Sequence, residues 1–146
     1  MSDRDQFMKS VFLFWILGAI DGHAKNFSLS IESQGRYQLT PLYDVMSAYP
    51  LAVKRQFEWK DLKMAMSLKS KNRHYHWDTI QLRHWLATAT YCQFSEERMQ
   101  MIIDDVFDNT EKVIDQVTAL LPKRFPQQMS DAIFSGMRKI KNKFKK

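Results

Sequence analysis

The spacing of apolar residues predicts a mainly helical chain. An apolar run covers residues 11–20 and is interrupted only by Gly18, with Asp3 and Asp5 upstream. We interpret it as a buried helix that leads into a polar loop at Asp21. The run is too short to cross a bilayer, and its acidic flank is unlike that of a signal peptide.

A period-two pattern follows this helix. Residues 27–31 alternate between apolar and polar, residues 33–35 contain turn-forming side chains, and residues 36–39 resume the alternation. This pattern predicts two antiparallel strands joined by a tight turn. Because a hairpin returns the chain to its starting point, we expect Asn26, before the first strand, to lie close to Asp44, after the second.

The second half of the chain, residues 77–146, is predicted to form a bundle of helices. Asp78 is a candidate N-cap for a first helix that breaks at residues 91–93, and Ser95 is a candidate N-cap for a long helix ended by Pro122. A third apolar stripe is formed by Met129, Ile133, Met137, Ile140 and Phe144. We expect these stripes to pack on one another, because the long segment lacks the sustained heptad of a coiled coil.

The net charge of +6 indicates attraction to anionic partners. Much of it comes from residues 138–146, to which Lys69, Lys71 and Arg73 add. Two interpretations remain open for this tail, a nucleic-acid or other anionic contact and a solvated, frayed terminal helix. No base-reading motif is visible.

The few metal-ligating and thiol side chains add little chemistry. Cys92 is alone, so no intramolecular disulfide can form, and we interpret it as a small buried hydrophobe of a cytoplasmic protein with no membrane association. His74 and His76 alternate as in a strand, and without an acidic neighbour they are more typical of surface or packing positions than of a metal site.

The chemistry is concentrated at Asp21, Asn26 and Asp44. Phosphoryl transfer requires a carboxylate that orients or deprotonates the attacking hydroxyl, and hard oxygen ligands for Mg²⁺. Protein kinases meet both needs with Asp-x-x-x-x-Asn and a second Asp beyond a hairpin. The order and spacing of the three residues here fit that arrangement.

Longer strings make the resemblance specific. Residues 21–28 (DGHAKNFS) and 39–48 (LTPLYDVMSA) resemble the catalytic loop and metal-binding segment of the HipA family, the serine/threonine kinase toxins of bacterial toxin-antitoxin pairs. Residues 62–67 and 71–75 also resemble the segment that follows in that family. The similarity extends over most of the chain.

The resemblance implies the C-terminal lobe of a protein-kinase-like (HipA-like) fold, mainly α with a small β-hairpin. It implies ATP and Mg²⁺ as cofactors, Asp21 as the base, and Asn26 and Asp44 as metal ligands. His23 would hydrogen-bond the transferred phosphate or brace the loop, and Lys25 would reach phosphate or face solvent. Tyr43 stands where ordinary kinases have Phe, and no Gly follows Asp44.

The resemblance also implies partners. Family members phosphorylate a protein serine or threonine, of which glutamyl-tRNA synthetase is the best-known example. They pair with a helix-turn-helix antitoxin that represses the operon, so a basic surface that contacts DNA within the complex is reasonable.

A nucleotide-covering part is not visible in the sequence. The four glycines, at 18, 22, 35 and 136, form neither a Gly-x-Gly-x-x-Gly loop nor a P-loop. We therefore expect residues 1–146 to form a single C-terminal lobe, with the catalytic and metal segment at 21–48, that is inactive without an N-terminal lobe or a split-kinase subunit. The alternative is a non-catalytic binding module derived from a kinase lobe, which engages an antitoxin, DNA or a kinase partner.

Overall fold

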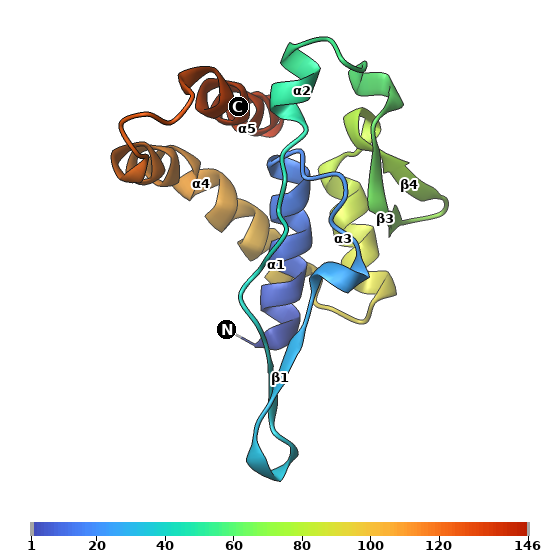
Figure 1. Ribbon diagram of the computed structural model, residues 1–146. Coiled ribbons are helices and arrows are strands. Elements are labelled where there is room, and N and C mark those ends of the chain that lie inside the picture. Colours follow the sequence, from blue (N-terminus) through green and yellow to red (C-terminus); the bar gives the residue numbers. More distant parts are fainter. Residues whose placement is uncertain (1, 146) are drawn as a thin grey trace.

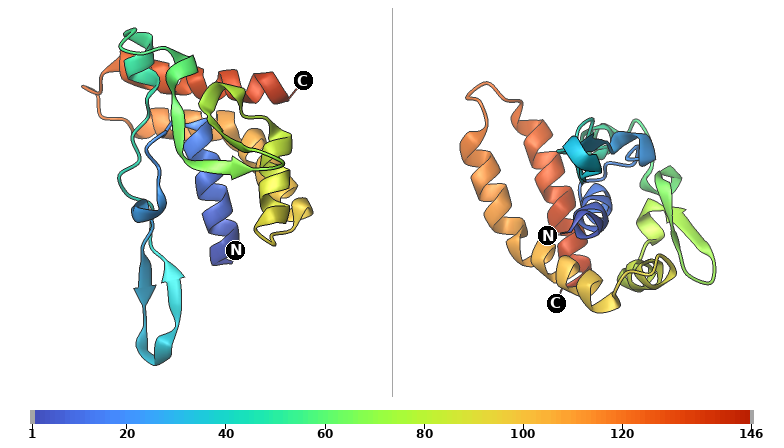
Figure 2. Two further views of the ribbon diagram at one scale, coloured as in Figure 1. Left: turned by 90° about the vertical axis from the view of Figure 1, so that its right-hand side faces the viewer. Right: turned by 90° about the horizontal axis from the view of Figure 1, so that it is seen from below.

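The computed structural model describes residues 2–145 and is organised around a central first helix (Figure 1). A hairpin projects from the body, and the last two long helices lie side by side (Figure 2). The helices and strands are α1 (Asp3–Ile16), β1 (Leu29–Ile31), β2 (Tyr37–Leu39), α2 (Tyr49–Val53), β3 (Lys63–Lys69), β4 (Arg73–His76), α3 (Leu82–Tyr91), α4 (Glu96–Leu120) and α5 (Gln127–Phe144). Short 3₁₀ turns are η1 (Ala24–Asn26), η2 (Ser33–Gly35), η3 (Trp59–Asp61) and η4 (Trp77–Thr79).

Helix α1 ends earlier than the apolar run predicted. It stops at Ile16 because Gly18 adopts a φ of +62°. The Gly18 amide donates to the Trp15 carbonyl at 3.1 Å, and the Ala19 amide donates to the Phe14 carbonyl at 2.7 Å. This pair of bonds is a Schellman C-cap, for which glycine is favoured because L side chains resist positive φ. Residues 17–20 therefore form a turn that directs the chain into the polar loop.

An aromatic cluster forms the centre of the core. Trp15 and Trp85 are each only 1% exposed, and their rings lie 5.7 Å apart. Phe12 contacts Trp85 edge-to-face at 5.1 Å and Phe107 at 5.7 Å. These contacts join α3 and α4 to α1. Helix α4 also packs against both α3 and α5, which agrees with the predicted packing of the apolar stripes on one another.

A reciprocal pair of hydrogen bonds joins Trp15 to Trp77. The Trp15 indole Nε1 donates to the Trp77 carbonyl at 3.2 Å, and the Trp77 indole Nε1 donates to the Trp15 carbonyl at 3.0 Å. Both groups are buried and both are satisfied by the other residue, as buried indoles require. The pair fixes the chain after the second hairpin to the core helix.

Residues 2–145 form two antiparallel hairpins, whereas the sequence pattern predicted one. The predicted hairpin forms between β1 and β2, where Leu29 pairs with Leu39 and Ile31 with Tyr37. The second forms between β3 and β4, with a register break between Lys63 and Leu68. The fold class, mainly helical with small β-hairpins, is confirmed.

The predicted start of α3 is wrong. Gln81 occupies the N-cap position, and Asp78 lies in the preceding turn η4. Burial explains the difference, because the 3₁₀ turn directs both Trp77 and Ile80 into the core. The break after Tyr91 is confirmed.

The predicted ends of α4 are confirmed. Ser95 caps the helix by accepting a hydrogen bond from the Arg98 amide at 3.2 Å, and the helix ends at Leu120, shortly before Pro122.

Cys92 is exposed, so its prediction as a buried residue is wrong. It follows the last turn of α3 as the C-cap, where the chain turns at the surface. Between residues 2 and 145, no helix combines the length and the apolar character that a membrane crossing requires.

The basic tail is ordered as part of α5 as far as Phe144, rather than frayed. Arg138 and Lys141 form ion pairs with Glu111 at 2.9 and 3.3 Å. Lys145 forms an ion pair with Asp108. Acidic residues of α4 thus neutralise part of the positive charge of the tail. Lys146 lies outside the described residues.

Candidate active site

The loop that begins at Asp21 lies directly on α1. Gly22 is buried, and its amide donates to the Ala19 carbonyl at 3.2 Å. A Cβ built on Gly22 would lie 2.2 Å from the Phe14 ring, which is itself 1% exposed. Only glycine allows this close approach of the loop to the helix. The loop position is therefore set by core packing.

Asn26 joins the two halves of the site, as predicted from the hairpin. The residue is 5% exposed. The Oδ1 atom accepts a hydrogen bond from the His23 amide at 3.0 Å, and Nδ2 donates to Asp44 Oδ2 at 3.2 Å. A backbone donor on one side and a carboxylate on the other fix the orientation of the amide group.

The segment around Asp44 has a second anchor. The Tyr43 hydroxyl donates to the Lys25 carbonyl at 2.9 Å and lies 2.8 Å from Ser28 Oγ. Asp44 itself is exposed and has a φ of +55°, a conformation that is uncommon for residues with a side chain. The contacts of Asn26 and Tyr43 hold this backbone, and the Asp44 carboxylate remains accessible to solvent.

A third set of contacts ties the same segment to the end of α1. Ser47 Oγ donates to the Leu17 carbonyl at 2.6 Å, and the Ala48 amide donates to the Gly18 carbonyl at 2.9 Å. These bonds lie at the turn that leads to Asp21. Sequence reasoning missed Ser47, because a single serine in a loop gives no signal of its bonding partner.

The remaining predicted residues lie in two different environments. Asp21 and Lys25 are exposed, which leaves both side chains accessible to a ligand. His23 is half-buried, and its Nδ1 is buried without a hydrogen-bond partner in residues 2–145. The Ile20 carbonyl, one residue before Asp21, accepts a hydrogen bond from the Ala65 amide of β3 at 2.8 Å. The second hairpin thus supports the loop from the other side.

The oxygen atoms of Asp44 and Asn26 are of the type that Mg²⁺ prefers. Within residues 2–145, no group of three or more His, Cys, Asp or Glu side chains is placed to form a metal cage. Mg²⁺ usually retains waters and binds through one or two carboxylates together with substrate phosphates. The accessible Asp44 carboxylate fits that mode of binding. Asn26 turns its Nδ2 toward Asp44 and its Oδ1 toward the His23 amide, so ligation by the amide oxygen would require the amide group to turn over.

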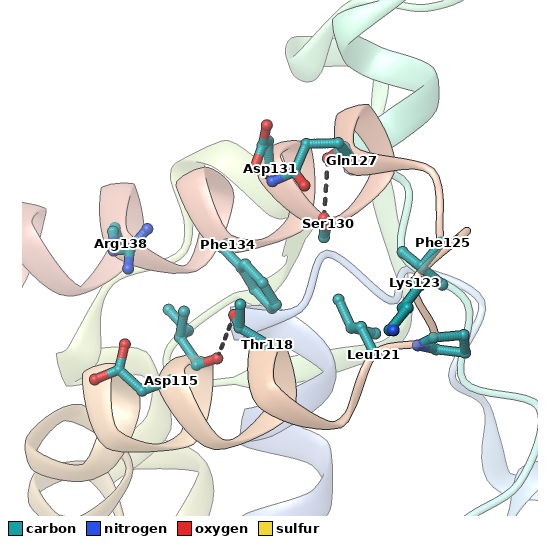
Figure 3. Close-up of a pocket in the computed structure, with 12 residues that line it drawn as sticks. Asp115, Thr118, Leu121, Lys123, Phe125, Gln127, Ser130, Asp131, Phe134 and Arg138 are labelled. Carbon is teal, nitrogen blue, oxygen red and sulfur yellow. Dashed lines mark hydrogen bonds between the residues drawn. The ribbon is translucent and has the colours of Figure 1, made fainter.

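A separate pocket of about 380 Å³ lies between α4 and α5, away from these residues (Figure 3). Several of its polar groups are bonded locally: Thr118 Oγ1 donates to the Ile114 carbonyl, Ser130 Oγ donates to the Gln127 carbonyl, and Arg138 pairs with Glu111. We therefore interpret it as a crevice between two helices, and we place the candidate chemistry at residues 21–44.

Comparison with known proteins gives two findings. The family model described as the HipA-like C-terminal domain matches residues 1–114. A solved chain from the Shewanella oneidensis MR-1 toxin-antitoxin system complex of HipA, HipB and its operator DNA matches with a TM-score of 0.77 and 16% sequence identity. That match covers 97% of the present chain and 31% of the solved chain. At this level of identity, the structural match shows a shared fold.

Proposed function

Because this chain belongs to the family of HipA-like C-terminal domains, we propose that it is the C-terminal lobe of a kinase that transfers phosphate from ATP to a protein serine or threonine. The observation that carries the proposal is the contact between Asn26 Nδ2 and Asp44 Oδ2 at 3.2 Å. It brings the two proposed metal ligands together on the segment that begins at Asp21. This arrangement suits in-line transfer, in which catalysis rests on positioning and on charge stabilisation.

Each residue has a distinct role in this proposal. The Asp21 carboxylate accepts a hydrogen bond from the attacking hydroxyl and takes its proton as the new P–O bond forms and the bond to ADP breaks. Asp44 and Asn26 would hold Mg²⁺, which would supply charge neutralisation on the phosphates when bound. Lys25 is accessible for contact with a phosphate oxygen. His23 braces the loop through its amide, which donates to Asn26.

The proposal requires a second structural unit to cover the nucleotide. The pairing of β1 with β2 places Leu29, Ile31 and Tyr37 on one face, where they are 54%, 77% and 65% exposed. An isolated two-stranded hairpin is only marginally stable in water, so an exposed apolar face on it favours a covering partner. We propose that an N-terminal kinase lobe, supplied in cis or in trans, covers this face.

Further partners are proposed from the structural neighbour, which is described as a complex with HipB and operator DNA. A helix-turn-helix antitoxin and its DNA are the corresponding partners for this chain. The protein substrate is a further partner.

Reconstitution tests the catalytic proposal. The 146-residue chain is combined with an N-terminal kinase lobe of the same family, and transfer of labelled phosphate from ATP to protein is measured with and without Mg²⁺. We expect transfer only in the combined sample, and its loss in the Asp21→Asn variant. Asp115→Asn, which removes an exposed carboxylate on α4, is the matched control. Transfer that persists in Asp21→Asn would refute the assignment of the base.

A non-catalytic binding module is the second candidate. It is favoured by the same contact, because both ends of the Asn26 amide group are hydrogen-bonded within the chain, Oδ1 to the His23 amide and Nδ2 to Asp44. This reading predicts no Mg²⁺-dependent nucleotide binding in any assembly, and partner binding that Asp44→Asn leaves unchanged. Calorimetric titration of the reconstituted protein with ATP, with and without Mg²⁺, distinguishes the two functions.

A further inference from the structure

The ribbon formed by β3 and β4 carries positive charge that no carboxylate of residues 2–145 neutralises. Lys69, Lys71 and Arg73 lie at its tip, and residues 62–76 contain no Asp or Glu. None of the three takes part in the ion pairs found within residues 2–145. The tail of α5 differs, because three of its cations, Arg138, Lys141 and Lys145, are paired with Glu111 and Asp108 of α4.

Two of these cations face each other across the ribbon. Lys69 and Arg73 are directly opposed in the β3–β4 register. Like charges at opposed positions destabilise a hairpin. An anion bound between or beside them would reduce this electrostatic repulsion. Their side chains have only uncharged partners, since Lys69 Nζ donates to the Lys71 carbonyl at 3.4 Å and Arg73 donates to Ser67 Oγ at 3.3 Å.

Hydrogen bonds to α3 and within the turn fix the backbone of the tip. The Lys69 amide donates to Thr88 Oγ1 of α3 at 2.8 Å, and the Ser70 amide donates to the Asn72 carbonyl at 2.9 Å. Ser70 Oγ and His74 Nε2 lie 2.6 Å apart. The tip therefore presents its cations from a preorganised turn, which lowers the entropic cost of binding a ligand.

We propose that the tip of the β3–β4 ribbon binds the phosphate backbone of a nucleic acid. The ribbon is a narrow, two-stranded element that extends beyond α3 (Figures 1 and 2), and the major groove of DNA admits an element of this width. Duplex DNA carries one charge per about 1.7 Å of axis, so it offers several phosphates to a compact group of cations. The Ser and Asn side chains of the same turn add donors of the kind that contact phosphates.

The test measures binding of the full chain to a fluorescein-labelled duplex DNA by anisotropy over a range of salt concentrations. Three phosphate contacts correspond to a slope of about −2.7 in log K against log salt, or about a 40-fold loss of affinity between 50 and 200 mM salt. The ribbon variant replaces Lys69, Lys71 and Arg73 with Gln, and we expect it to abolish most of this slope. Circular dichroism and thermal unfolding check that the variant is folded.

A control of equal charge separates local contact from net charge. Replacing Lys112, Lys123 and Arg124 with Gln changes the net charge by the same amount on exposed positions of α4 and the following loop. We expect this control to bind DNA nearly as well as the unmodified chain. Equal loss in both variants, or no binding at low salt, would overturn the proposal. So would tighter, ribbon-dependent binding of a poly-glutamate peptide, which would assign the surface to an acidic protein partner.

Discussion

Replacing Asn26 with Asp tests the geometry on which the candidate active site depends. The substitution retains an oxygen that can accept from the His23 amide, but it exchanges the donor to Asp44 for a second negative charge. It therefore converts an attractive contact at 3.2 Å into a repulsive one. The change in size is negligible, so packing around the buried side chain is retained.

The expected cost follows from the distance and from the exposure of Asp44. A lost hydrogen bond to a charged group costs about 1.5 to 3 kcal/mol. Coulomb repulsion at that separation ranges from about 1.3 kcal/mol in water to about 5 kcal/mol at an effective dielectric constant of 20. Because Asp44 is exposed and can move away, we expect a loss of about 2 to 3 kcal/mol in the free energy of unfolding at pH 7.

Chemical denaturation at two pH values and with added Mg²⁺ provides the assay. Two adjacent carboxylates raise the pKa of one of them, so the variant should recover stability as the pH falls from 7 to 5. If the pair also binds Mg²⁺ with a Kd of about 1 mM, 10 mM Mg²⁺ should raise the free energy of unfolding of the variant by about 1.4 kcal/mol. Asn26→Ala, which adds no charge, should show neither response.

Two results would refute the reasoning. If Asn26→Asp has the same pH dependence between 5 and 7 as the unmodified chain, residue 26 does not contact Asp44 in solution. If the pH response appears but Mg²⁺ has no effect, the contact is correct and the proposed metal site is wrong.

Two further predictions concern stability. Gly22→Ala places a methyl group against the Phe14 ring, so it should cost about 1 to 3 kcal/mol in thermal unfolding, and an unchanged melting temperature would contradict the observed packing. Burial, followed by the neighbouring His74, lowers the pKa of His84 below its ordinary 6.5. As the pH falls, His84 is therefore protonated in the unfolded chain before it is protonated in the folded one. Its contribution to the free energy of unfolding is complete above pH 6.5 and declines below it. Urea unfolding at pH 7.5 and 5.5 should show this decline, and a smaller one in His84→Asn.

The sequence predicted best those features that local residues determine. Both ends of α4 follow from Ser95 and Pro122, which act within one helical turn. The approach of Asn26 to Asp44 follows from the antiparallel hairpin between them. The general position of the candidate site could therefore be predicted without the structure, although the contacts of Ser47 and the burial of the His23 Nδ1 atom could not.

The missed features depend on contacts between distant residues. The β3–β4 ribbon was missed although residues 63–69 largely alternate between polar and apolar. Its pairing is interrupted between Lys63 and Leu68, and the Ala65 amide bonds to the distant Ile20 carbonyl. Asp78 resembles an N-cap, but burial of its neighbour Trp77 outweighs the capping preference. Cys92 is apolar enough for a core, but the end of α3 lies at the surface.

The Trp15–Trp77 pair has a consequence for the order of folding. The two residues are 62 positions apart, and the entire candidate active site lies between them in sequence. A contact that closes so long a loop forms slowly, so we expect it to form after the local turns of the hairpins. Once it has formed, both ends of the segment between the two tryptophans are fixed to the core. Residues 21–44 can then open and reclose by local fluctuation while the core helices remain folded.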